Sequence, residues 1–185
     1  LFRFLRLPNH PAVVKRCLII DRPLIFNEPW ERRMLNCHLS MEPGSSIHIL
    51  PTSGGLHYRG GSIRGCSTYW NGITTSPGVN LNLEATIISG ASTAVSIEDQ
   101  VKMQLRGNTF EDNLFGVDIA DSATMTGVPI FGCTFKNCTV GINNRGNLIV
   151  GAEFSPNVFD SCVTGIVSVD GNLFLSNTTF QKCNT

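Results

Sequence analysis

Three aspartates recur at equivalent places in a repeated pattern and suggest metal or sugar chemistry. Asp99, Asp121 and Asp170 each stand eleven residues after an apolar residue that opens a short motif, and Gly146 takes the corresponding place between them. If successive copies of the motif stack, Asp99 and Asp121 lie about one strand spacing (~4.8 Å) apart. Two carboxylates that close could bind Ca²⁺ through their oxygens or contact a sugar. The alternative is that these aspartates stabilise turns by accepting hydrogen bonds from nearby backbone amides.

Other signs of catalysis are weak. The sequence does not predict a cluster of aspartates with a histidine and a basic residue in one groove, because all the histidines precede Asp99, Asp121 and Asp170 in the chain. Arg106 is the nearest arginine, but it stands four residues before an apolar anchor, which predicts an outward position remote from the aspartates. The sequence also contains no nucleophile elbow, phosphate loop or metal-binding helix motif.

Trp70 is a further candidate for binding, with two interpretations. An exposed indole could stack on a sugar ring, whereas a buried one would fill a corner of the fold. The surrounding Trp70-Asn71-Gly72-Ile73 favours packing at a corner, because a small residue followed by an aliphatic one is typical of a tight bend that enters a strand.

The element that must position these residues is a repeat. Apolar anchors recur at intervals of 25, 22, 25, 24 and 21 residues, and they are Ile63, Ile88, Phe110, Phe135, Phe159 and Phe180. Seven and five residues before each anchor stands an alternating apolar pair, as one face of a strand requires. These pairs are Leu56/Tyr58, Leu81/Leu83, Met103/Leu105, Val128/Ile130, Ala152/Phe154 and Leu173/Leu175. A unit of this length cannot bury its own apolar face, so the copies must stack. The sequence therefore predicts an all-β, right-handed parallel β-helix with about three short strands in each coil of 21 to 25 residues.

Two further columns follow from the same spacing. Three residues after the anchors stand Cys66, Ala91, Asn113, Cys138, Cys162 and Cys183. The odd total of 7 cysteines cannot be fully paired in disulfides, and the lack of Cys-x-x-Cys pairs argues against a zinc site. Buried packing of the thiols is the simpler interpretation, and disulfides between adjacent coils are the alternative. One residue after the anchors stand Arg64, Ser89, Glu111, Lys136, Asp160 and Gln181, which predicts a solvated ladder of cross-strand charges.

Composition and charge limit the partners. At 185 residues the chain is long enough for one domain, and only 15% of its residues are charged. Its 14 basic residues balance 14 acidic ones without a basic stripe, which argues against nucleic acid as a partner. The apolar segment 1–7 is too short and too interrupted by arginine for a membrane span or a signal segment.

The two ends of the chain differ in regularity. Residues 1–55 are expected to form an irregular segment with the first coils and part of a cap. Leu39, 24 residues before Ile63, could open one further coil, and residues 17–21 could belong to a coil earlier still. Residues 56–185 are expected to form the regular coils. The repeat stops at Thr185 before the next bend, which favours a fragment of a longer polypeptide that continues with further coils or domains.

Several runs resemble secreted right-handed β-helix repeat proteins of the Bacteroidota, many of which are cargo of type IX secretion. The resemblance covers roughly residues 35–183 and is carried by residues 41–49, Gly65-Cys66, residues 70–73, residues 108–113 and Gly116-Val117. It implies a secreted or cell-surface location. The same architecture also hosts pectate lyases, polygalacturonases and phage tailspikes, so the fold alone selects no function.

Two functions follow as expectations. The first is a non-catalytic extracellular scaffold, surface-exposed or adhesive, that contacts polysaccharide or a cell-surface glycan and needs no cofactor other than Ca²⁺ at Asp99 and Asp121. The second is a fragment of a carbohydrate-active lyase or hydrolase whose decisive residues lie in other coils.

Overall fold

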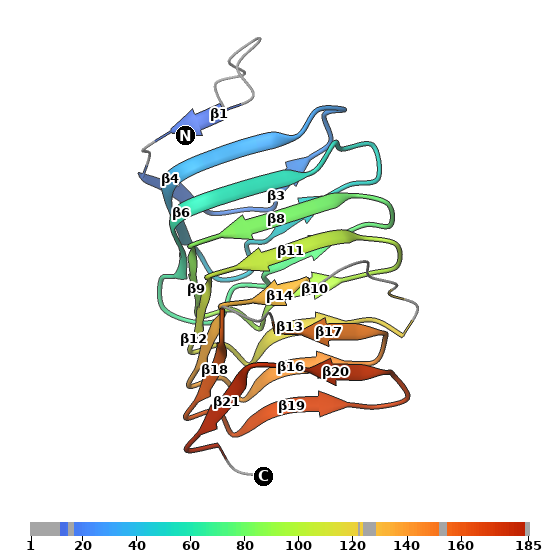
Figure 1. Cartoon of the computed structure of the whole chain (residues 1–185). Helices are drawn as coiled ribbons and strands as arrows, with labels where there is room; N and C mark the ends of the chain where they lie inside the picture. The colour runs from blue at the N-terminus through green and yellow to red at the C-terminus, as the bar shows by residue number, and fades with distance from the viewer. Residues whose placement is uncertain (1–11, 15–16, 122, 124–128, 152–154, 184–185) are drawn as a thin grey trace.

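The chain folds into a parallel solenoid of short β-strands, seen here in a computed structural model that describes residues 12–14, 17–121, 123, 129–151 and 155–183 (Figure 1). These residues form no α-helix. Each coil runs through three faces, and all the strand pairs between coils are parallel. The predicted all-β parallel architecture is confirmed.

The strands fall into two sheets, one of 14 strands and one of 7. The larger sheet bends and covers two faces. On its first face lie β8 (Asn80–Glu84), β11 (Lys102–Arg106), β14 (Ile130–Phe131), β17 (Leu148–Val150) and β20 (Leu173–Leu175). On its second face lie β2 (Cys17–Ile20), β9 (Ile87–Ser89), β12 (Thr109–Glu111), β15 (Thr134–Lys136), β18 (Asn157–Asp160) and β21 (Thr178–Gln181). The long strands β4 (Arg32–Met41) and β6 (Leu56–Gly65) run through both faces, and β1 (Ala12–Val14) pairs with β4.

The smaller sheet forms the third face. It contains β3 (Leu24–Phe26), β5 (Ile47–Ile49), β7 (Ile73–Thr75), β10 (Thr93–Ile97), β13 (Phe115–Ile119), β16 (Val140–Asn144) and β19 (Thr164–Ser168). Strand β3 lies in a segment that looked irregular from its prolines and mixed charges, and it pairs with β5 in the same parallel register. With β1 paired to β4, the parallel ladders of the solenoid continue back to residue 12.

The predicted anchors stand in one unbroken column on the second face. Backbone pairing aligns Ile63 with Ile88, Ile88 with Phe110, and so on to Phe180. The same column extends backwards to Leu39 and Leu18. All the anchors from Leu39 to Phe159 are at most 2% exposed, so this column forms one wall of the core.

The first face departs from the predicted register at one coil. The alternating pair Ala152/Phe154 was expected to follow Val128/Ile130, but Ile130 pairs with Val150 of β17. Strand β17 supplies its own alternation, with Leu148 and Val150 buried and Ile149 exposed. The register prediction was therefore wrong here, because the additional residues lengthen the corner between β17 and β18 instead of the strand. Val128, Ala152 and Phe154 lie outside the described residues.

Left-handed backbone conformations bound each anchor strand. Two residues after the anchors, φ is positive at Gly90, Asp112, Asn137, Ser161 and Lys182. Three residues before the anchors, φ is positive at Asn36, Gly60, Ala85, Gly107, Gly132 and Asn177. A single residue in this region turns the chain sharply, and glycine and asparagine adopt it at low cost. These two columns create the corners that give the solenoid its faces.

A stack of phenylalanines fills the core of the later coils. The rings of Phe110, Phe135, Phe159 and Phe180 follow one another at centroid distances of 4.9, 4.6 and 4.9 Å and are nearly parallel. The stack explains a glycine six residues after an anchor: a Cβ at Gly141 would lie 2.7 Å from Cδ1 of Phe159 and 2.5 Å from the carbonyl oxygen of Gly165. The residue at this bend must have a small side chain or none, because the phenylalanine ring of the next coil occupies the space beside it.

The stack leads to a stability prediction. Phe135→Ala removes a fully buried ring that contacts both neighbours, so we expect a loss of about 3–5 kcal/mol in the free energy of unfolding. Phe174→Ala is the matched control, because this side chain is 66% exposed and should cost less than about 1 kcal/mol. Urea denaturation of both variants measures the difference. Equal losses would contradict a core that depends on the stack.

Candidate functional site

Buried asparagines at the corners satisfy backbone groups of the preceding coil. Asn113 accepts a hydrogen bond from Ala91 N at 2.8 Å and donates one to Ile88 O at 3.1 Å. Asn108, which stands two residues before its anchor, accepts a hydrogen bond from Thr86 N at 3.0 Å and donates one to Leu83 O at 2.7 Å. Both side chains are 1% exposed. These asparagines have a structural role, because an unpaired buried amide or carbonyl would be costly.

The cysteine column follows the same principle. The thiols of Cys138, Cys162 and Cys183 point at carbonyl oxygens of Phe110, Phe135 and Phe159, at 3.6, 3.5 and 3.4 Å. These three cysteines are free thiols, and the first two are buried. The structure thus agrees with packing and not with disulfides between coils. The thiols also act as weak hydrogen-bond donors.

The aspartates on the third face meet an arginine that the spacing did not predict. Strand pairing aligns Ile97 with Ile119, so Asp99 and Asp121 follow equivalent positions, as expected. Asp121 is exposed, and its Oδ1 lies 3.6 Å from Nε of Arg145. The same guanidinium lies 3.3 Å from Asp118 Oδ2, and Asn143 donates to Asp118 Oδ1 at 2.7 Å. The cluster is therefore two carboxylates sharing one cation.

Arg145 competes with any metal at this place. Within the described ranges, no group of three or more His, Cys, Asp or Glu side chains could hold a metal ion. A calcium ion at Asp121 would have to displace the guanidinium or tolerate its charge. The calcium site at Asp99 and Asp121 stays a proposal. The aspartate column could not predict the contact with Arg145, because Arg145 precedes Gly146 at a position where the repeat has no characteristic residue.

Trp70 is not available to a sugar. Its side chain is fully buried, and its indole Nε1 donates to Ser89 O at 3.0 Å. Its backbone forms a bridge with Ala91 on the next coil. The platform interpretation was therefore wrong, and the interpretation as a packed corner residue was correct.

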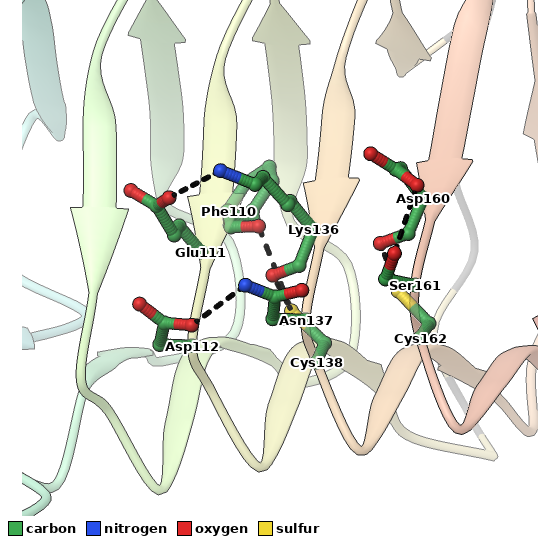
Figure 2. A network of polar contacts seen from close by, with 9 residues as sticks. All are labelled: Phe110, Glu111, Asp112, Lys136, Asn137, Cys138, Asp160, Ser161 and Cys162. Carbon is green, nitrogen blue, oxygen red and sulfur yellow. Dashed lines mark hydrogen bonds and ion pairs between the residues drawn. The ribbon is translucent and has the colours of Figure 1, made fainter. Parts of the chain in front are cut away.

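The charge column on the second face forms a polar ladder between coils (Figure 2). Glu111 and Lys136 are paired across strands, with Nζ 3.0 Å from Oε1. One residue further, Asn137 donates to Asp112 Oδ1 at 3.2 Å. The ion pair with Glu111 raises the pKa of Lys136 from its ordinary value. The predicted cross-strand ladder is confirmed for Glu111 and Lys136, which contact each other while exposed to solvent. Ser89 of the same column is only 8% exposed, and among the described residues no other ion pair links members of this column.

The first face carries a second ladder. Glu84 lies between Arg59 and Arg106, which are its register neighbours on the two adjacent coils. Its carboxylate is 3.3 Å from Arg59 and 3.7 Å from Arg106. The expectation that Arg106 lies on the outward face of a strand, remote from the aspartates, is confirmed. Its partner is Glu84 on the preceding coil.

Comparison with known families identifies the repeat. A sequence model described as a right handed beta helix region matches residues 32–154. No curated protein and no solved structure matches the chain. In the part of the chain that the structure describes, no helix could span a membrane.

The burial of Cys133 leads to a prediction of reactivity. Burial raises the pKa of its thiol to about 11, and only the thiolate reacts with alkylating agents. A pH of 8 lies below this pKa, so the buried thiol stays protonated in the folded protein. At this pH we expect iodoacetamide to leave Cys133 unmodified and to label the exposed Cys66. Mass spectrometry of the labelled protein measures the pattern. Labelling in denaturant, where both thiols should react, is the control, and modification of Cys133 at the rate of Cys66 in the folded state would contradict the burial.

The aspartate cluster leads to a calcium experiment. If Arg145 competes with the metal, Arg145→Gln should let calcium raise the melting temperature more than it does in the parent chain. Adding Asp121→Ala to the Arg145→Gln variant should abolish this calcium-dependent increase in melting temperature. Thermal unfolding over a calcium titration measures both effects. A melting temperature that is insensitive to calcium in the parent and in Arg145→Gln would rule out the site.

Proposed function

Because the chain belongs to the family of right-handed β-helix regions, we propose that it is a non-catalytic extracellular scaffold whose outer faces contact polysaccharide or a cell-surface glycan. The family supplies the architecture and selects no activity. The choice of a scaffold rests on how the outward side chains are used.

The observation that carries the proposal is the pairing of outward charges between coils. Glu111 is engaged by Lys136, and Glu84 by Arg59 and Arg106. A general acid or base must be free to exchange a proton with a substrate held within hydrogen-bond reach. Carboxylates already bound to cations of neighbouring coils are better suited to holding the surface of the solenoid in one arrangement.

A repeating surface favours a repeating ligand. Each coil presents outward side chains at the strand spacing of ~4.8 Å, so a polymer lying along the solenoid meets similar groups again and again. Individually weak contacts then add up through multivalency. This argument supports polysaccharide as the partner. The secreted or cell-surface location is part of the same proposal and is supported by the family resemblance of the repeat.

One observation favours the enzyme alternative. Asp118, Asp121 and Arg145 bring two carboxylates and a basic group together on the third face. Lyases and hydrolases on this architecture use such combinations, and Asp121 is 79% exposed in its side chain, so a substrate could reach it. The fragment of a carbohydrate-active enzyme is therefore the second candidate function.

A polysaccharide panel distinguishes the two functions. We expect the protein to be retained on at least one immobilised polysaccharide, with retention increasing with polymer length, and to release neither reducing ends nor unsaturated products. Affinity electrophoresis and product assays on the same polymers measure both properties. Product formation that Asp121→Ala or Asp99→Ala abolishes would establish the enzyme instead. A lack of retention on every polymer would reject the glycan contact.

A further inference from the structure

An open hollow lies on the second face where β2, β4 and β6 run side by side. Its volume is about 480 Å³, within the range of small-ligand sites. It is formed by the earliest described coils and lies far along the chain from the aspartate cluster. Neither the calcium proposal nor the ion pairs of the surface ladders involve its residues.

One exposed apolar side chain lines the hollow. Leu18 and Leu39, the consecutive anchors of the core column, turn their side chains toward the interior, whereas Ile19 faces outward with 69% of its surface exposed. An isoleucine at this place is unusual for the column that follows the anchors, which carries polar or charged residues from Ser40 onwards. The hollow can therefore cover the hydrocarbon part of a ligand and shield this side chain from water.

Arg64 borders the hollow as a cation without an acidic partner among the described residues. Arg59, Arg106 and Arg145, by contrast, each lie within 4 Å of a carboxylate, at distances of 3.3, 3.7 and 3.3 Å. The register neighbours of Arg64 are Ser40 and Ser89, which are uncharged. Its guanidinium thus has donors available for an anion, and a planar guanidinium matches a carboxylate in a two-point hydrogen bond.

Polar side chains are held in fixed positions between Arg64 and Ile19, because Ser40 is the register neighbour of both residues. Nδ1 of His38 lies 3.0 Å from Oγ of Ser62, and Oγ of Ser40 lies 3.1 Å from Sγ of Cys66. Ser62 is 8% exposed and Arg64 follows it by two residues on the same strand face. These contacts place hydroxyl groups next to the guanidinium, where they can hydrogen-bond an anionic oxygen.

We propose that this hollow binds a small organic acid with an aliphatic body, its carboxylate on Arg64 and its hydrocarbon chain over Ile19. A single guanidinium balances one negative charge, which fits a carboxylate better than a doubly charged phosphate group. The exposed Ile19 adds affinity only for a ligand that has hydrocarbon to bury, which excludes a bare inorganic ion and a fully hydroxylated sugar acid as the best ligand. This inference is independent of the scaffold function, since glycan contact would use the repeated flank.

Isothermal titration with hexanoate, acetate and glucuronate tests the proposal. Each methylene that leaves water should tighten binding about fourfold, so hexanoate should bind at least about tenfold more tightly than acetate. Hexylamine, which has the same body and the opposite charge, should not bind. Glucuronate carries its carboxylate on a polar sugar body, and binding of glucuronate as tight as that of hexanoate would overturn the proposal.

Two exposed positions supply variants that leave the core intact. Arg64→Gln should weaken hexanoate binding at least about fivefold by removing the charge-assisted hydrogen bonds. Ile19→Ser should reduce the advantage of hexanoate over acetate while leaving acetate binding unchanged. Arg106→Gln is the matched control, an outward arginine on another face, and should bind hexanoate like the parent. Unchanged binding by Arg64→Gln, or no hexanoate binding by a folded parent chain at millimolar concentration, would refute the site.

Discussion

Parallel stacking in register is the constraint on which the rest of this structure depends. Each coil hydrogen-bonds to the next through backbone ladders, so every residue has counterparts about one strand spacing above and below. A side chain is therefore selected for its fit against its own equivalents as much as for its place in the coil. The stacked rings of Phe110, Phe135 and Phe159 show the apolar form of this selection.

The corners are where the constraint is hardest to satisfy, because a turning backbone leaves amides and carbonyls without ladder partners inside the solenoid. The chain meets this need with side chains that reach one coil back. Asn113 serves both an amide and a carbonyl, whereas the thiol of Cys138 in the next coil contacts two carbonyl oxygens, those of Phe110 and Lys136. In the coil where the corner residue is Gly61, a Cβ would lie 1.9 Å from Cys37 O, and the hydroxyl of Tyr58 donates to that carbonyl instead. Different residues thus perform one task.

This redundancy explains what the sequence could predict. The anchors, the corner columns and the ladder of Glu111 and Lys136 follow from counting, because repetition imposes the same environment on equivalent positions. Counting failed where repetition failed. The register of β17 changed because residues added at a corner leave no trace in the apolar pattern, and Leu148 and Val150 offered an equally good alternation. The partners of Asp118 and Asp121 were missed because Arg145 occurs in one coil only.

The positions that break the repeat are also those that bear on function. Stacking needs the interior and the corners, and it leaves the outward side chains free to vary provided that like charges are not placed side by side. Arg59 and Arg106 obey this condition by sharing Glu84. Arg64 stands between Ser40 and Ser89, two strands from the exposed Ile19, and its charge has no acidic partner among the described residues. An unneutralised cation beside exposed hydrocarbon has no structural explanation in the described coils, and recognition of a ligand that carries both complementary features supplies one.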